Sequence, residues 1–222
     1  MKTLLITGAG KGIGYATTVL AANQGHQVIA LSRNISALKD IDGVQPYSVD
    51  LAKPEEISAF VDQLKDTQID VLLNNAGVLT KTPIEESSFA LYERIYKVNV
   101  FGLAELTRLV LPLMNNDGHV VNISSMGGIQ GSAKFPGLSI YSSSKAAVIT
   151  LTELWAEELK ESGPRCNALA LGAVQTQMLA EAFPGFKAPI TATDFANYVL
   201  DFCLTGQLYY NGKVLQVSSS TP

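Results

Sequence analysis

A glycine-rich stretch near the start of the chain constrains the fold more than any other feature. It covers residues 7–14 (TGAGKGIG), follows the apolar, β-prone residues 2–6 and precedes residues 15–24, whose composition suits a helix. A strand entering a helix through such a turn brings backbone N–H groups and the positive end of the helix dipole close to an anion. Glycine lets a pyrophosphate approach and supplies positive φ where the turn needs it. The stretch therefore predicts nucleotide binding, with a merely tight turn as the alternative.

Strand-like and helix-like segments alternate along the rest of the chain. Such alternation predicts an α/β fold in which a parallel, doubly wound sheet carries helices on both faces. No repeat or linker divides the 222 residues, so a single domain over residues 1–222 is expected. The further strands are expected at residues 27–31, 44–49, 70–74, 120–123, 165–171 and 213–217, and the further helices at 54–64, 89–114, 141–161 and 194–204.

Composition and charge exclude several classes of function. Hydrophobic residues make up 47% and charged residues 16%, as in an ordered globular protein, and the net charge of −4 argues against nucleic-acid binding. Cys166 and Cys203 have no CxxC partner and are expected to be reduced and buried. His26 and His119 lack metal-ligand spacing, so no metal is expected. With neither a signal peptide nor an apolar run of membrane length, we expect no membrane association and a cytoplasmic location.

The end of the second expected strand indicates which nicotinamide cofactor is used. NAD-binding units place an acidic residue there, which binds the 2′-hydroxyl of the adenosine ribose. This chain has Ser32 and Arg33 instead, and Lys11 in the glycine turn adds a second cation. These side chains can bind and neutralise a 2′-phosphate, so NADP(H) is expected in preference to NAD(H). A solvated arginine at a strand end is the alternative.

Two further strand ends supply expected cofactor contacts. Asp50 follows the third strand at the carboxyl edge of the sheet, where it can contact the adenine, with Leu51 beside it. Residues 74–77 (NNAG) end the fourth strand with small and amide side chains that can approach the cofactor. A plain turn is the competing interpretation of that segment.

Tyr141 and Lys145 form the expected catalytic pair. Positions four apart lie on one face of a helix, so the phenol and the ammonium are neighbours. A tyrosine pKa of about 10 makes a poor acid–base catalyst at neutral pH, and we expect the ammonium to lower it. Tyr141 can then protonate a carbonyl oxygen as hydride arrives at the carbon. A second Tyr-x-x-x-Lys, Tyr209 to Lys213, crosses a turn and is treated as chance.

With this pair, the chain resembles the compact form of the short-chain dehydrogenase/reductase family from end to end. The resemblance implies a Rossmann-like, seven-stranded parallel sheet in dimers or tetramers. It makes Tyr141 the acid–base residue, Ser125 the group that orients the carbonyl, with Ser124 as a rival, and Lys145 the ribose ligand that tunes Tyr141. Asn99 would position a water of the proton relay, and Val174 and Thr176 would hold the carboxamide. The remaining expected cofactor-binding positions are Gly8, Gly10, Gly12, Ile13, Gly14, Asn75, Ala76, Gly77 and Gly172.

Some segments depart from the pattern of the family. Ser125 and Tyr141 lie further apart than is usual, with the glycine-rich residues 127–139 between them. Leu171 replaces the proline that usually precedes the glycine at Gly172, and residues 218–220 (SSS) stand where many members have Asp-Gly-Gly. The short segment after Thr176 predicts a small lid and an open pocket.

The leading functional hypothesis is an NADPH-dependent reduction of a ketone or aldehyde to an alcohol. The alternative enzyme is a 3-oxoacyl carrier-protein reductase, for which Arg94, Lys97 and Arg108 are candidate docking cations. The non-enzymatic alternative is an NADP(H)-binding regulator without turnover. The expected partners are a small carbonyl or alcohol substrate and further copies of the chain. Helices 89–114 and 141–161 carry apolar residues on more than one face, which predicts a homodimer or homotetramer.

Overall fold

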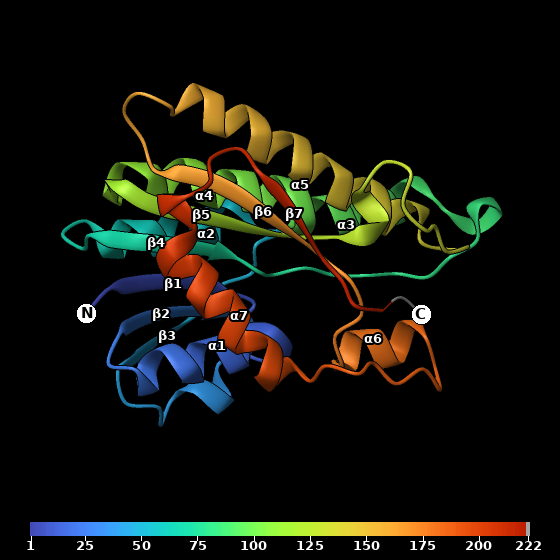
Figure 1. The fold of residues 1–222 in the computed structure, drawn as a ribbon, viewed down its shortest axis with the longest axis horizontal. Helices are drawn as coiled ribbons and strands as arrows, with labels where there is room; N and C mark the ends of the chain where they lie inside the picture. The colour runs from blue at the N-terminus through green and yellow to red at the C-terminus, as the bar shows by residue number, and fades with distance from the viewer. Residues whose placement is uncertain (221–222) are drawn as a thin grey trace.

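The computed structural model describes residues 1–220, and its centre is one seven-stranded parallel sheet (Figure 1). The strands lie in the order β3-β2-β1-β4-β5-β6-β7, and every neighbouring pair is parallel. This confirms the expected doubly wound α/β fold. The strands are β1 (Thr3–Thr7), β2 (Gln27–Ser32), β3 (Val44–Ser48), β4 (Ile69–Asn74), β5 (Met114–Ser125), β6 (Arg165–Leu171) and β7 (Val214–Val217).

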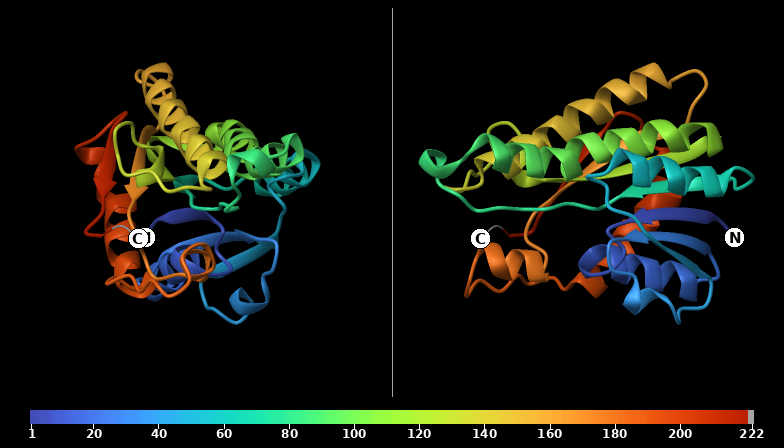
Figure 2. Two further views of the ribbon diagram at one scale, coloured as in Figure 1. Left: turned by 90° about the vertical axis from the view of Figure 1, so that its right-hand side faces the viewer. Right: turned by 180° about the vertical axis from the view of Figure 1, so that it is seen from behind.

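Helices cover both faces of the sheet. On one face α1 (Gly12–Asn23) packs beside α7 (Ala192–Thr205), and on the other lie α2 (Pro54–Val61), α4 (Leu103–Val110) and α5 (Ser139–Glu158). Figure 2 shows the two groups on opposite sides of the strands. Two shorter helices, α3 (Phe89–Tyr96) and α6 (Gln177–Ala182), complete the chain.

The core has two halves, one on each face of the sheet. Alternate residues of a strand point to opposite faces, so Leu4 and Ile6 of β1 pack toward α1 and α7, whereas Leu5 packs toward α2 and α4. All three side chains are fully buried. Burial on both faces explains why the strands read as continuous apolar runs in the sequence.

The order of the strands reverses between β1 and β4. β1 pairs with β2 on one side, where Ile6 lies opposite Ala30, and with β4 on the other, where Ile6 lies opposite Leu73. The connections after these two strands therefore leave in opposite directions and open a crevice at the carboxyl edge of the sheet. Both the glycine turn and the residues 74–77 meet at this crevice.

The helix expected over residues 89–114 has a more complex form. It consists of α3, a π-helical turn (Lys97–Gly102), α4 and a short 3-10 turn (Leu111–Leu113). Gly102 packs so closely on the backbone of Leu51 that a Cβ has no room. Pro112 has no backbone N–H and lies at the start of the 3-10 turn, after which Met114 already belongs to β5. Such local changes are invisible to hydrophobic periodicity.

Other boundaries differ from the expected ones by a few residues, and α5 begins at Ser139 and ends at Glu158. Helix α6 was not expected from the sequence. Cys166 and Cys203 are free and buried, as predicted. In residues 1–220, no helix has both the length and the apolar character needed to cross a membrane, and no cluster of acidic, histidine or cysteine side chains is arranged to hold a metal ion.

Candidate active site

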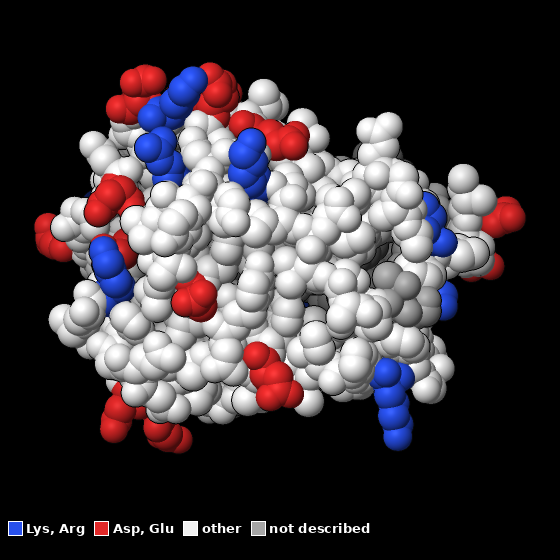
Figure 3. Space-filling view, viewed as in Figure 1, with Lys and Arg blue, Asp and Glu red and all other residues white. Residues whose placement is uncertain are grey.

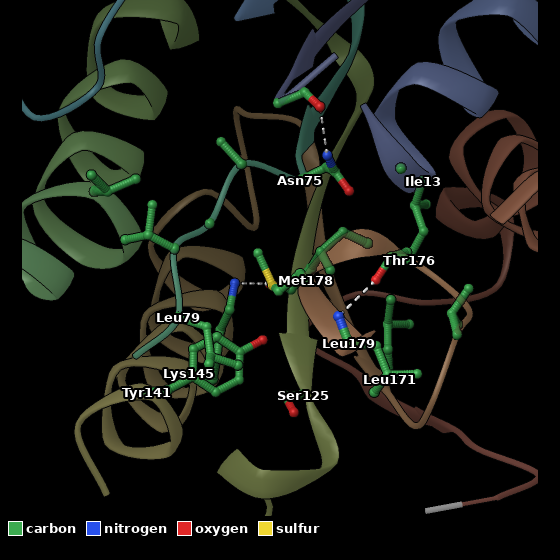
Figure 4. Close-up of a pocket in the computed structure, with 18 of the residues that line it drawn as sticks. Ile13, Asn75, Leu79, Ser125, Tyr141, Lys145, Leu171, Thr176, Met178 and Leu179 are labelled. Carbon is green, nitrogen blue, oxygen red and sulfur yellow. Dashed lines mark hydrogen bonds between the residues drawn. The ribbon is translucent and has the colours of Figure 1, made fainter. Parts of the chain in front are cut away.

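A cavity of about 300 Å³ opens at the carboxyl edge of the sheet (Figure 4). Its lining comes from the segments that follow β1, β2, β3, β4, β5 and β6, together with the start of α5 and one side of α6 (Gln177, Met178, Leu179 and Ala182). In an open parallel sheet, ligands bind at this edge, where the strand order reverses. The cavity is therefore the candidate active site.

The glycine turn forms one wall of the cavity. Gly8 and Gly12 have φ of 67° and 59°, values that side chains rarely adopt, and both line the cavity beside Lys11 and Ile13. Lys11 precedes α1, and no side chain caps the first turn of that helix. Its free N–H groups and its dipole can therefore meet an anion in the cavity.

Gly10 and Gly14 serve packing, which differs from the cofactor contact expected of them. Neither lines the cavity. A Cβ on Gly10 would lie 2.5 Å from the Ser32 hydroxyl, and a Cβ on Gly14 would collide with the Asn75 amide and the Gly8 carbonyl. These two glycines let the β2 and β4 ends close on the turn, so their effect on a ligand is indirect.

Thr7 and Asn75 tie the ends of β1 and β4 together. The Thr7 hydroxyl accepts hydrogen bonds from the backbone N–H groups of Asn75 and Ala76 at 3.0 and 2.9 Å. The Asn75 amide in turn donates to the Thr7 carbonyl at 2.9 Å. Asn75, Ala76 and Gly77 thereby line the cavity in one fixed arrangement. Sequence reasoning missed this role of Thr7, although its position directly before Gly8 was visible.

The basic residues lie at the end of the cavity formed by β1, β2 and β3. Ser32, Arg33, Asp50 and Leu51 line this end with Lys11. Asp50 accepts a hydrogen bond from the backbone N–H of Ala52 at 3.0 Å, which stabilises the turn. Within residues 1–220, neither Arg33 nor Lys11 takes part in an ion pair. Their charges are available to an anionic ligand.

Tyr141 and Ser125 meet at the opposite end of the cavity. Tyr141 lies in the first turn of α5, Ser125 ends β5, and the Ser125 hydroxyl is close enough to the phenol to influence its pKa. Both residues line the cavity (Figure 4). Ser124 points away, because its buried hydroxyl donates to the Lys145 carbonyl at 2.8 Å. Of the two rival hydroxyls, the structure thus brings Ser125 to the phenol.

Lys145 lies one helical turn after Tyr141 and is almost fully buried. Its ammonium donates to the Ile123 carbonyl at 2.8 Å and lies 6.0 Å from the centre of the Tyr141 ring. Burial lowers the pKa of Lys145 to about 8, because it disfavours the charged form.

The expected acidification of Tyr141 is wrong for the chain by itself. Burial raises the pKa of the phenol to about 12, and the nearby Ser125 hydroxyl opposes this rise only in part. The ammonium of Lys145 is directed to a backbone carbonyl, so it does not offset the burial of the ring. A protonated phenol is therefore the resting form of Tyr141.

Asn99 lies behind the cavity wall and does not line the cavity. It is fully buried in the π-helical turn, where its amide oxygen accepts from the N–H of Val78 at 2.8 Å and its amide nitrogen donates to the Val78 carbonyl at 2.9 Å. The same nitrogen donates to the Ser144 hydroxyl at 3.0 Å. Asn99 thus connects the loop after β4 with the second turn of α5.

The segment after β6 lines the cavity with Gly172, Val174 and Thr176. The Thr176 hydroxyl caps α6 by accepting from the N–H of Leu179 at 3.2 Å. Gly172 leaves the space that the side chain of Ser218 occupies, and the carbonyl of Ser220 accepts from the N–H of Ala173 at 3.1 Å. The unusual serines near the end of the chain therefore support this wall.

An apolar group of cavity residues lies in the loops expected from the sequence to line the pocket, but the sequence did not identify the individual residues. They come from the loop after β4, from residues 127–139 and from the segment that folds as α6. No local signal identified them, because their contacts join loops far apart in the sequence. We call the following residues the apolar end of the cavity: Leu79, Phe135, Leu138, Met178, Leu179 and Phe183.

Comparisons with known proteins agree with this geometry. A family model described as short chain dehydrogenase matches residues 2–185. The 3-oxoacyl-[acyl-carrier-protein] reductase FabG of Thermotoga maritima is 38% identical over 80% of this chain and 76% of its own length. A 3-ketoacyl-(acyl-carrier-protein) reductase from Brucella melitensis, solved with NADH, superposes with a TM-score of 0.89 at 26% identity, covering 99% of this chain and 97% of that one. A short chain dehydrogenase from Burkholderia cenocepacia in complex with NADP has the same fold, with a TM-score of 0.87 at 22% identity, 99% of this chain and 97% of that one being covered.

Proposed function

This chain belongs to the short-chain dehydrogenase family of NAD(P)-dependent oxidoreductases, and from that premise we propose that it reduces a ketone or aldehyde to an alcohol with NADPH. One observation carries the proposal. Tyr141 and Ser125 both line the cavity, and the Ser125 hydroxyl is close enough to influence the phenol, with Lys145 one helical turn away. Two O–H donors at one point suit an oxygen that gains negative charge.

The cavity fits a dinucleotide. Gly8 and Gly12 form a backbone cradle that a side chain would strain, and the uncapped start of α1 suits a pyrophosphate. Lys145 would hold the nicotinamide ribose, and Val174 and Thr176 the carboxamide. When bound, the reduced nicotinamide supplies the hydride that the carbonyl carbon needs. The other residues proposed to hold the cofactor are Lys11, Ile13, Ser32, Arg33, Asp50, Leu51, Asn75, Ala76, Gly77 and Gly172.

The protein contributes a proton donor and a charge. Tyr141, protonated at neutral pH, donates a hydrogen bond and then its proton to the carbonyl oxygen, and Ser125 donates a second hydrogen bond. The phenolate left behind recovers a proton from water, so the net reaction consumes one hydride and one proton for each carbonyl reduced. The charge is the Lys145 ammonium, which lies 6.0 Å from the centre of the Tyr141 ring and is held by the Ile123 carbonyl, and Asn99 fixes the helix turn that carries both groups.

NADPH is the proposed cofactor because of the basic end of the cavity. Solved relatives of the same fold hold NADH in one case and NADP in another, so the family alone does not decide. Ser32 stands at the end of β2, followed by Arg33, and Lys11 lies in the same lining. A 2′-phosphate finds two cations and a hydroxyl there, whereas no carboxylate at the end of β2 receives a 2′-hydroxyl.

Reduction of a 3-oxoacyl group on a carrier protein is the second candidate, favoured by the relative from Thermotoga maritima. An acidic carrier needs a basic docking surface. Lys97 and Arg108 are paired with Glu93 and Glu105 at 3.0 and 2.6 Å, which reduces their attraction for a carrier. On the face drawn in Figure 3, basic and acidic side chains are interspersed. A free small molecule is therefore the preferred substrate.

We also propose a homodimer or homotetramer formed through the helical regions 89–114 and 141–161. Phe89, Phe101 and Leu154 support it, because these large apolar side chains are 83%, 58% and 53% exposed. The one continuous sheet supports a single domain over residues 1–222, of which residues 221 and 222 lie outside the described part. The free, buried cysteines support a cytoplasmic setting.

The test is a measurement of NADPH oxidation at 340 nm by the purified chain with a panel of ketones and aldehydes. NADPH binding is measured separately by the fluorescence of the reduced nicotinamide. Turnover of a carbonyl together with binding supports the proposal. Tight binding with no turnover on any substrate would instead favour a cofactor-binding regulator.

A further inference from the structure

The two ends of the cavity differ in charge. The charged side chains of the lining are Lys11, Arg33, Asp50 and Lys145. The first three follow β1, β2 and β3, on the side of the sheet away from β5 and Tyr141. Lys145 is occupied by the Ile123 carbonyl. Among residues 1–220, the apolar end, which lies beside the reacting hydroxyls, therefore presents no charged side chain to a substrate.

Three loops meet above the apolar end and form a roof, which we define by Lys81, Phe135 and Phe183. The rings of Phe135 and Phe183 pack edge to face, with centres 5.3 Å apart. The ammonium of Lys81 lies 4.7 Å from the centre of the Phe183 ring and donates to the Ala182 carbonyl at 3.1 Å. The neighbouring Thr82 N–H donates to the Gly137 carbonyl at 2.8 Å.

Lys81 is the one cation of this roof, and its position decides how it can act. It does not line the cavity, and its charge already meets a carbonyl oxygen and an aromatic face. The ammonium also closes the end of the short helix α6, since Ala182 is the last residue of that helix. Lys81 therefore joins the loop after β4 to the segment that carries Met178, Leu179 and Phe183.

Resting on the proposed reductase function, we propose that the substrate is an uncharged ketone or aldehyde with an apolar group, which the roof encloses. Lys81 is a positioning residue that holds the roof and does not bind a substrate anion. A carboxylate moved from water to the apolar end would lose its hydration without gaining a partner, whereas an apolar group gains by leaving water. Leu79 and Met178 line the same cavity as Tyr141, where such a group would lie.

A matched pair of probes tests the substrate class. Ethyl benzoylformate and benzoylformate share the ketone and the phenyl ring, and they differ in carrying an ester or a carboxylate. With NADPH, we expect kcat/KM for the ester to exceed that for the acid on the order of 100-fold. In a thermal-shift assay of the complex with NADP⁺, the ester should raise the melting temperature further and the acid should not.

The possible failures are distinguishable. Equal or faster reduction of the acid, or a larger thermal shift with the acid, overturns the substrate class and leaves the reductase function intact. Reduction of an acetoacetyl thioester with neither binding nor reduction of the ester also overturns it, and favours the carrier-linked reaction. Absence of NADPH binding together with no turnover on any probe overturns the proposed function itself.

Variants of Lys81 test the roof. Lys81→Met keeps the length of the side chain and removes the charge, so KM for the ester should rise about fivefold to tenfold while kcat changes little. Lys81→Arg should restore KM, and the control is Lys65→Met, whose exposed ammonium pairs with Asp62 at 3.5 Å outside the cavity lining. A Lys81→Met enzyme that loses activity on the acid and keeps its KM for the ester would show that Lys81 binds anions.

Discussion

The two ends of the cavity differ in how well their residues can be recognised from the sequence. The cofactor end is formed by short contiguous segments, above all the glycine turn and the segment after β4, whose residue types stand out in the sequence and which Thr7 and Asn75 tie together. The apolar end rests on three loops that meet only in the folded chain, through Lys81, Phe135 and Phe183. A charged, narrowly constrained end and an apolar, loop-built end thus lie in one cavity. The comparison shows that residues proposed to bind the cofactor can be recognised from local sequence motifs. The residues proposed to select the substrate can be recognised only from the tertiary contacts of the folded chain.

The largest expected effect concerns the chemistry between the two ends. Tyr141→Phe removes the hydroxyl that donates to the carbonyl and leaves the ring, so kcat should fall about a thousandfold. NADPH binding and the melting temperature should change little, because the ring still fills its place. Stopped-flow or steady-state oxidation of NADPH measures the fall. A variant with a kcat within tenfold of the original would exclude Tyr141 as the proton donor.

The next effect tests the cofactor end alone. Ser32→Asp combined with Arg33→Ile places a carboxylate where the 2′-phosphate is expected and removes a cation, so the ratio of kcat/KM for NADPH to that for NADH should fall about a hundredfold. The control is Lys39→Ile, which removes an exposed cation of the same connection outside the cavity lining. The preference for ester over acid should stay the same. An unchanged cofactor ratio would remove Arg33 from the site.

A third prediction compares a glycine packed closely against its neighbours with a glycine that has open space around it. Gly14→Ala pushes a methyl group into the Asn75 amide and the Gly8 carbonyl, so the free energy of unfolding should fall by about 2 kcal/mol and NADPH binding should weaken. Gly131→Ala meets no atom within 4 Å, although its φ of 74° is strained, and it should lower stability by about 1 kcal/mol with no effect on binding. Urea denaturation measures both. Equal losses in the two variants would contradict the close packing at Gly14.

The smallest expected effect is a gain in stability. Lys145→Met replaces a buried ammonium by an apolar chain of similar size, so the variant should be more stable by about 1 kcal/mol at pH 7 although it is inactive. The pKa of Lys145 is about 8 in the folded chain and about 10.4 when unfolded, so the unfolded chain binds more protons between these values. The original protein should therefore gain stability as the pH rises from 8 to 10, and the variant should lack this gain. Thermal melts across that range test both statements.

Much of the fold could be predicted because its signals are periodic or local. The buried strands read as apolar runs, and the turn between β1 and α1 required glycine. The π-helical turn and α6 gave no such signal. Gly102 is needed because the backbone of Leu51, a residue distant in sequence, leaves no room for a Cβ. Helix α6 is short, and Lys81 closes its end. The helix ends earlier than expected near Pro112, because strand β5 begins at Met114.

The candidate site was predictable in its residue types and less so in its electrostatics. The structure brings Ser125, Tyr141 and Lys145 together, and tertiary contact alone distinguishes Ser125 from Ser124. The pKa of Tyr141 could not be predicted from the sequence, because it depends on how deeply the ring is buried and on where the ammonium points. Gly10 and Gly14 show the same limit, since a missing side chain can make room for a ligand or for a neighbouring segment.

The reversal of strand order at β1 and β4 has a consequence for how such a protein can diversify. The first part of the chain, up to β3, supplies the residues proposed to select the cofactor, and the later part supplies the reacting hydroxyls and the roof. Few residues belong to both tasks, so inherited changes in one part leave the other task largely intact. Selection can therefore exchange the redox partner and the substrate of this scaffold one at a time.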